Sequence, residues 1–149
     1  MDSRDLHELR LDEMNEQEAF RFLTLLLSKL DPEEEYAVRH EDYVLEMPQS
    51  GERIRGRENM RAFQRSYSSL SPSEPTRRVR VRGVLVKEDL WVVEGIADYP
   101  EGRTLDVIMI SELREGKMWR DRWYFADPFE APEWRSQWVE RQETGTGQG

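Results

Sequence analysis

The first half of the chain places hydrophobic residues at the spacing of an α-helix. Between Asn15 and Lys29 they recur at i, i+3, i+4 and i+7, which predicts an amphipathic helix whose apolar face comprises Ala19, Phe22, Leu23, Leu26 and Leu30. Asp31 is a candidate N-cap followed by a proline at the first helical position, so a second, short helix is expected to start there and to end near His40. Helical spacing returns over residues 57–70 and predicts a third helix.

From Thr76 onward the hydrophobic period changes to two. Four strand-like runs follow one another, and hairpin signals separate them at Glu88-Asp89, Pro100-Glu101-Gly102 and Glu115-Gly116. Because the connections between successive runs are short, these strands are expected to form an antiparallel meander.

The order of these elements predicts an α+β fold. Residues 41–47 add an earlier strand, and the spacing of Trp134 and Trp138 predicts a short C-terminal helix after the meander. The three N-terminal helices have to cover one face of the sheet to bury their apolar stripes. A strongly curved antiparallel sheet then leaves a cone-shaped cavity between the helical layer and the sheet.

Length, composition and charge indicate the number of domains and exclude several classes of partner. The 149 residues suit one domain. We expect an N-terminal extension over residues 1–14, the α+β domain over 15–142 and a disordered tail over 143–149. The acidic N-terminus does not resemble a secretory signal, and no apolar run approaches the ~18 residues of a membrane span, so a cytoplasmic protein without a membrane partner is expected. The net charge of −9 argues against nucleic-acid binding.

The sequence does not predict a metal site or a catalytic thiol. The chain has no cysteine, and its two histidines, His7 and His40, do not form a ligand spacing with each other. No glycine-rich phosphate loop is apparent. We therefore expect neither a metal nor another cofactor.

Three stretches resemble the nuclear transport factor 2-like superfamily, in particular its SnoaL-like, polyketide-cyclase-like branch. They are EDYVLEMP at residues 41–48, GRENMRAF at 56–63 and GKMWRDRWYF at 116–125, and the resemblance covers roughly residues 15–127. It implies a cone-shaped α+β barrel with an interior pocket, usually dimeric. It does not imply one activity, because this fold hosts isomerases, cyclases, epoxide hydrolases, dehydratases and non-catalytic binders.

The catalytic residues of these relatives are largely replaced here. Ketosteroid isomerases use a base, a carboxylic acid and a phenol, and the matching positions here are Met47, Met109 and Phe22. The ketosteroid isomerase reaction is therefore not expected. The catalytic acid of the epoxide hydrolases matches Glu94, but their arginine matches Val92.

The last strand retains one carboxylate near the position that relatives use. The general acid or base of the SnoaL-like cyclases, and the base of the epoxide hydrolases, both fall on Trp123. Asp121 lies two residues earlier and therefore faces the same side of the strand. An alternative is that a cross-strand arginine or an indole N–H satisfies Asp121 as a structural group.

Glu94 is the stronger catalytic candidate in the sequence. If the hairpins close symmetrically, Glu94 lies opposite Met109 and beside Gly83 on a face that is otherwise apolar. Burial would raise the pKa of a lone acid on such a face, which suits general acid–base catalysis. The alternative is a glutamate that is hydrogen-bonded to a Tyr, Trp or Arg of the helical layer.

These assignments define a predicted pocket and a predicted interface. The pocket residues are Phe22, Met47, Val92, Asp98, Met109, Trp119 and Trp123. The opposite sheet face carries Trp91, Val93, Ala97, Ile108 and Ile110, and it predicts a homodimer through the convex face of the sheet.

Three functional hypotheses follow from this pocket. The protein binds a small apolar or amphipathic molecule, and Glu94 with Asp121 performs acid–base catalysis of the isomerase, cyclase or hydratase type. Alternatively it is a binding module without turnover. A third possibility is an interaction protein whose cavity is filled by its own side chains, including Trp134 and Trp138.

Overall fold

The helices begin and end largely where the sequence predicts. A computed structural model describes residues 3–69 and 78–142, and the end of the predicted third helix at residue 70 and the tail over 143–149 lie outside the described residues. The described helices that follow the N-terminal segment are α2 (Glu16–Lys29), α3 (Pro32–Ala37) and α4 (Arg57–Ser69).

Side-chain caps fix the starts of the first two of these helices. At α2, Asn15 accepts a hydrogen bond from the Glu18 backbone N–H at 2.8 Å, and the Glu18 side chain accepts one from the Asn15 N–H at 3.0 Å. At α3, Asp31 accepts from the Glu33 N–H at 2.9 Å. Helix α3 ends at Ala37, earlier than predicted, because the first strand already starts at Arg39.

One open sheet of six strands forms the second layer of the described structure. Its spatial order is β2-β1-β6-β5-β4-β3. The strands are β1 (Arg39–Met47), β2 (Glu52–Arg55), β3 (Arg78–Lys87), β4 (Leu90–Asp98), β5 (Thr104–Arg114) and β6 (Lys117–Ala126). Strands β3 to β6 form the predicted antiparallel meander, but β1 pairs with β6 in parallel. The sheet is therefore mixed, and the prediction of a purely antiparallel sheet is corrected.

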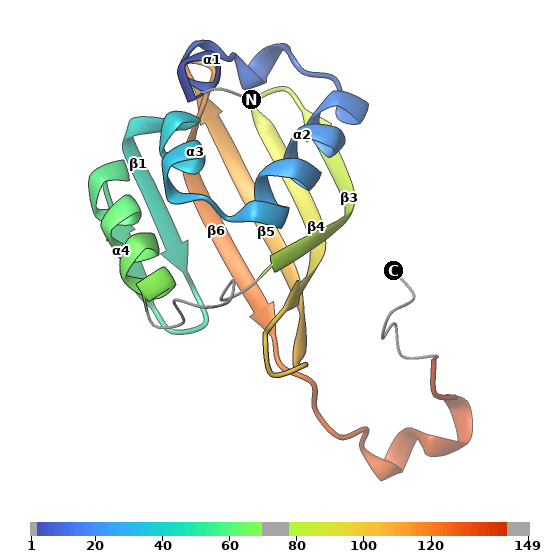
Figure 1. The fold of residues 1–149 in the computed structure, drawn as a ribbon. Coiled ribbons are helices and arrows are strands. Elements are labelled where there is room, and N and C mark those ends of the chain that lie inside the picture. The colour runs from blue at the N-terminus through green and yellow to red at the C-terminus, as the bar shows by residue number, and fades with distance from the viewer. Residues whose placement is uncertain (1–2, 70–77, 143–149) are drawn as a thin grey trace.

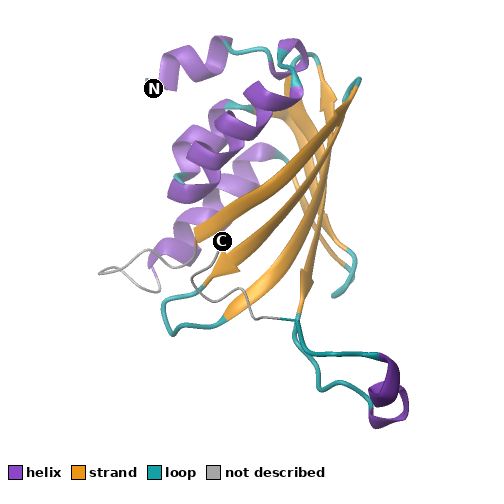
Figure 2. Ribbon diagram, turned by 90° about the vertical axis from the view of Figure 1, so that its right-hand side faces the viewer, coloured by secondary structure: helices purple, strands orange, loops and turns teal. Residues whose placement is uncertain are grey.

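The sheet curves around the helices, which lie on its concave side (Figures 1 and 2). Its pairing register shifts between Val81 and Gly83 in β3, and again where β5 meets β6. Such bulges bend a sheet and increase its twist. A Cβ atom at Gly95 would lie 2.7 Å from the Arg80 carbonyl oxygen, so glycine at this position permits the close approach of β3 to β4. The predicted α+β cone is thus confirmed.

The core lies between α2 and the concave face of the sheet. Leu23 and Leu26 of α2 are buried there together with Trp91 and Val93 of β4. Trp91, Val93 and Ala97 were predicted to form the dimer face, and that placement is wrong, because all three are core residues on the concave side. Long apolar side chains from both layers therefore occupy most of the interior.

The N-terminal segment packs onto this domain. It forms α1 (Ser3–Glu8) and the 3₁₀ helix η1 (Leu11–Glu13), and Leu6 and Leu11 are buried in the core. The Lys117 ammonium group of β6 donates to three backbone carbonyls at the end of α1, those of Leu6 at 3.0 Å, His7 at 2.7 Å and Leu9 at 2.8 Å. A cation at the C-terminus of a helix is favourable because the last carbonyls there have no helical partners.

The C-terminal segment leaves the domain instead of covering it. Its only described helical turn is η2 (Glu133–Trp138), a 3₁₀ helix, and it projects beyond the end of β6 (Figure 1). Trp134 and Trp138 are 75% and 72% exposed. The prediction of a C-terminal α-helix and the hypothesis that its indoles fill the cavity are both corrected.

Candidate functional site

Glu94 lies on the outer, convex face of the sheet, and its predicted placement in the cavity is wrong. Glu94 faces outward in the regular alternation of β4. The bulge after Val81 exchanges the two faces of β3, so its partner Gly83 also faces outward although Val79 faces inward. Glu94 pairs with Ile108, one residue away from the predicted partner Met109. Its side chain is 62% exposed and lies 4.0 Å from the Arg82 guanidinium. The burial on which its catalytic hypothesis depended is absent.

Three further predicted pocket residues lie away from the interior. Val92 and Asp98 share the outer face with Glu94, because residues two apart on a strand face the same side. The Asp98 carboxylate accepts two hydrogen bonds from Arg80, at 2.6 and 3.0 Å. Trp119 falls at the β5–β6 bulge, where the Arg114 guanidinium carbon lies 5.3 Å from the centre of its ring.

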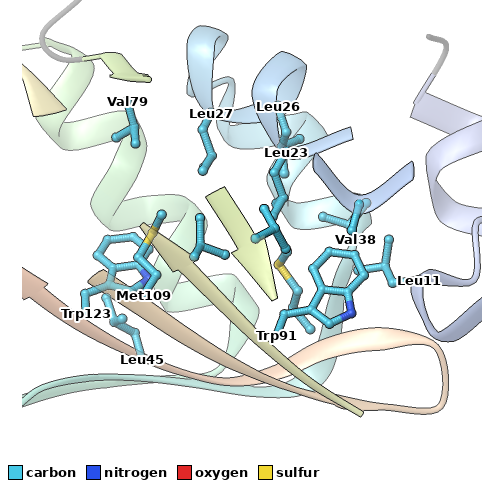
Figure 3. Packing of buried hydrophobic residues seen from close by; sticks show 14 of the residues in the cluster. Leu11, Leu23, Leu26, Leu27, Val38, Leu45, Val79, Trp91, Met109 and Trp123 are labelled. Carbon is cyan, nitrogen blue, oxygen red and sulfur yellow. The ribbon is translucent and has the colours of Figure 1, made fainter. Parts of the chain in front are cut away.

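Two predicted residues border the core, and three line its cavity. Phe22 and Met47 are partly buried and pack against the core without lining the cavity. Met109, Asp121 and Trp123 line it. Met109 and Trp123 are also a pair in the β5–β6 register, and they lie together below α2 in Figure 3.

Asp121 is one of two buried carboxyl groups that line this cavity among the described residues, and Glu35 is the other. Asp121 is 3% exposed, and it lies opposite Ser111 of β5 and Leu45 of β1. The Tyr43 hydroxyl donates a hydrogen bond to its Oδ2 atom at 2.6 Å. Among the described residues, Oδ1 has no hydrogen-bond partner.

The surroundings of Asp121 raise the pKa of its carboxyl above the ordinary value of an aspartate. Burial raises the pKa of the carboxyl, and the hydroxyls of Ser111 and Tyr43 and the charge of Arg39 offset only part of that rise. The folded protein therefore holds this proton more tightly than the unfolded chain does. The resulting stabilisation is present below about pH 3.9 and is lost as the pH rises through the raised pKa.

A buried ring of three polar side chains adjoins Asp121. The Arg39 guanidinium donates to Gln64 Oε1 at 2.8 Å and to Glu35 Oε1 at 3.0 Å, and the Gln64 amide donates to Glu35 Oε2 at 3.1 Å. The guanidinium carbon of Arg39 also lies 4.7 Å from the centre of the Tyr43 ring. The remaining nitrogen, Arg39 Nε, has no hydrogen-bond partner among the described residues.

A small cavity lies between α2 and the sheet and includes residues of both polar groups. Its volume of about 20 Å³ is enough for about one water molecule. Figure 3 shows how the leucines of α2 face the sheet residues across this interior. The lining residues are Leu23, Leu26, Leu27, Glu35, Arg39, Val93, Met109, Ser111, Met118, Asp121 and Trp123. The apolar lining is thus interrupted by a few polar groups.

Sequence reasoning missed Tyr43, which donates to Asp121, and the polar ring around Arg39. The alternation of β1 could have identified Tyr43, because it shares a face with Leu45. The i, i+4 spacing of Glu35 and Arg39 indicates an ion pair, but such pairs are usually solvated. Nothing in the local pattern marks Gln64 as buried.

The fold and its interior define a class of protein before any relative is considered. Helices cover the concave face of an open, curved sheet, which is the architecture of the NTF2-like α+β proteins. The profile of the SnoaL-like domain family matches residues 20–121. The chain therefore belongs to the SnoaL-like domain family.

Solved structures agree with this assignment. An NTF-2 like protein of unknown function from Burkholderia xenovorans is 36% identical, and the match covers 85% of this chain and 94% of that one with a TM-score of 0.67. A putative ketosteroid isomerase from Kribbella flavida is 24% identical over 86% of this chain and 90% of its own, with a TM-score of 0.72.

A more distant neighbour has a bound small molecule. This protein from Catenulispora acidiphila has a ketosteroid isomerase-like fold and was crystallised with trimethylamine. It is 12% identical, the match covers 75% of this chain and 88% of that one, and the TM-score is 0.61, so the likeness shows the fold alone. No curated protein gives a significant match to the sequence. None of the helices within residues 3–69 and 78–142 is long and apolar enough to cross a membrane.

Proposed function

We propose that the protein binds a small, largely apolar molecule inside the cone and that Asp121 holds the polar group of that molecule. The observation that carries this proposal is the buried Asp121 carboxyl, which lines the cavity and has one oxygen without a partner among the described residues. A buried carboxyl with a raised pKa is also suited to give or take a proton. Asp121 is therefore the proposed acid–base group for a reaction of the isomerase, cyclase or hydratase type.

Binding requires side chains to move, because the cavity has room for about one water molecule. Met109 is suited to make room, since its three rotatable bonds let it adopt several shapes at small cost. The Catenulispora acidiphila protein, which has a similar fold, was crystallised in complex with trimethylamine, and this supports the proposal that a protein of this fold binds a small molecule.

The small volume also favours a second candidate function. An interior that its own side chains fill would suit a binding or interaction module without turnover. The two candidates differ in whether small molecules reach Asp121.

Ligand-binding measurements test the proposal directly. We expect that at least one of phenol, cyclohexanone and trimethylamine shifts the NMR signals of the Met109 methyl group and the Trp123 indole. The matched variant is Asp121→Leu with Tyr43→Phe, which removes both partners of the buried hydrogen bond and leaves neither one unpaired. Affinity should fall about 5- to 150-fold in this variant, because one hydrogen bond to a buried polar group is lost. Equal affinity in both proteins would reject the role of Asp121.

The outer sheet face is the proposed surface for a second copy of the chain. Cross-strand pairing lines up Leu85, Val92 and Ile110 on this face, and Ile108 lies beside them. Leu85 and Ile108 are 65% and 44% exposed, an apolar patch that dimerisation would cover.

Sedimentation velocity at micromolar concentration tests this interface. We expect a dimer for the wild type and a monomer for Ile108→Glu, because the substitution places a charge in the apolar patch. The control is Leu25→Glu, at an exposed leucine of α2 on the opposite side of the sheet, and it should remain dimeric. A monomeric wild type would contradict the proposal.

A further inference from the structure

Two deeply buried polar atoms, which have no hydrogen-bond partner within residues 3–69 and 78–142, occur in residues that line one cavity. They are Arg39 Nε and Asp121 Oδ1, and the two residues are 2% and 3% exposed. Both residues line the cavity of about 20 Å³ between α2 and the sheet. Their charges also interact, since Asp121 is one of the groups that raise the pKa of Arg39.

Unpaired buried polar atoms are rare because each costs about 1–3 kcal/mol of desolvation. A cavity of this size accepts one oxygen-sized group, since about 10–15 Å³ is the lower limit for a water molecule. The two atoms also differ in what they require. Arg39 Nε–H can only donate a hydrogen bond, and an ionised Asp121 can only accept one.

We infer that the cavity is a binding site for a single hydroxyl oxygen, which accepts a hydrogen bond from Arg39 Nε and donates one to Asp121 Oδ1. A ligand that supplies this group is a small alcohol or phenol whose apolar body lies against Met109 and Trp123. Without such a ligand, one water molecule supplies the same chemistry. The inference has two halves. The ligand half, in which a ligand hydroxyl occupies the cavity, rests on the proposed function. The water half, in which a water molecule occupies it in the absence of a ligand, does not.

Other polar groups fit this pair of atoms less well. A ketone oxygen accepts from Arg39 but has no hydrogen to donate to an ionised Asp121. An ammonium group donates to Asp121 but cannot accept from Arg39. A hydroxyl group satisfies both atoms at once, and it is small enough for the cavity.

The first arm of the test is a crystal structure of the ligand-free wild type at high resolution. We expect one ordered oxygen within hydrogen-bond distance of both Arg39 Nε and Asp121 Oδ1. If the density shows the Ser111 hydroxyl donating to Oδ1 and no oxygen between the two atoms, the water half is overturned.

The second arm compares phenol with toluene, which have similar shapes and differ in the hydroxyl group. Met109→Ala provides room for either ring, and its folding is checked by urea unfolding. In this background, adding Asp121→Leu with Tyr43→Phe should lower the ratio of phenol affinity to toluene affinity by about 5- to 150-fold, as expected for one buried hydrogen bond. Calorimetric titration of both probes measures the ratio. The crystal structure of the phenol complex should place the phenol oxygen where the water lies in the ligand-free protein.

The outcomes separate this inference from the proposed function. If both probes bind and the affinity ratio does not change, the hydroxyl site is overturned while ligand binding in the interior stands. If neither probe binds, ligand binding in the interior fails, and an ordered oxygen in the ligand-free crystal supports the site as one for water alone. If Met109→Ala does not fold, wild-type crystals are soaked with each probe instead. Density for phenol in the cavity, with none for toluene, supports the inference. Density for toluene, with none for phenol, overturns it.

Discussion

Replacing Arg39 with methionine should lower the free energy of unfolding by about 3–5 kcal/mol, because it leaves Glu35 as a buried charge without its partner. The two side chains are 2% and 3% exposed, so solvent screens their interaction little. The substitution also removes a positive charge that lowers the pKa of Asp121, so the Asp121 carboxyl should become harder to ionise. Urea unfolding monitored by circular dichroism measures the loss.

Two controls distinguish the buried pair from charge loss in general. Arg103 forms an ion pair with Glu101 in which both side chains are more than half exposed, and Arg103→Met should change stability by less than about 0.5 kcal/mol. The triple variant Glu35→Leu, Arg39→Met and Gln64→Leu replaces the whole ring with apolar side chains and should recover most of the stability. A triple variant as unstable as Arg39→Met alone would contradict this explanation.

Gly95→Ala should destabilise the fold by about 1–3 kcal/mol, the range of substitutions that overpack a well-filled site. The added Cβ atom would lie 2.7 Å from the backbone oxygen of Arg80, and β3 and β4 would have to separate to relieve the contact.

Gly83→Ala is the matched control for this substitution. Gly83 lies in the neighbouring strand, it has nothing within 4 Å of an added Cβ, and we expect a change within about 0.5 kcal/mol. Thermal unfolding of both variants measures the difference. Equal melting temperatures would mean that the sheet does not need the close approach at Gly95.

The fold was predictable because its signals are local or depend on the resemblance. Helical spacing and the cap at Asn15 define α2, and the two-residue period with its turn signals defines the meander. The parallel pairing of β1 with β6 was not predictable from these patterns, since nothing in either strand specifies a distant partner. The exposed position of η2 was also missed, because two tryptophans four residues apart usually indicate a buried face.

The facing of site residues was predictable where the alternation along a strand continues unbroken, and it was missed where the strand register shifts. Asp121 and Trp123 were placed correctly in the interior because β6 keeps its alternation between them. Glu94 was placed wrongly because β4 pairs with β5 one residue away from the predicted register, which puts Met109 opposite Val93 and on the other face of the sheet from Glu94. The polar ring around Arg39 joins α3, β1 and α4, and such tertiary contacts between separate elements have no periodic signal in the sequence.

The parallel contact between β1 and β6 has a consequence for how the protein folds. Tyr43 and Asp121 are 78 positions apart in the chain, and they meet only where these two strands pair. Closing a loop of that length costs chain entropy before its contacts form, whereas the meander hairpins close locally. We therefore expect the interior site to assemble in a late step of folding, after the meander has formed, so that partly folded chains with intact hairpins lack the Tyr43–Asp121 hydrogen bond.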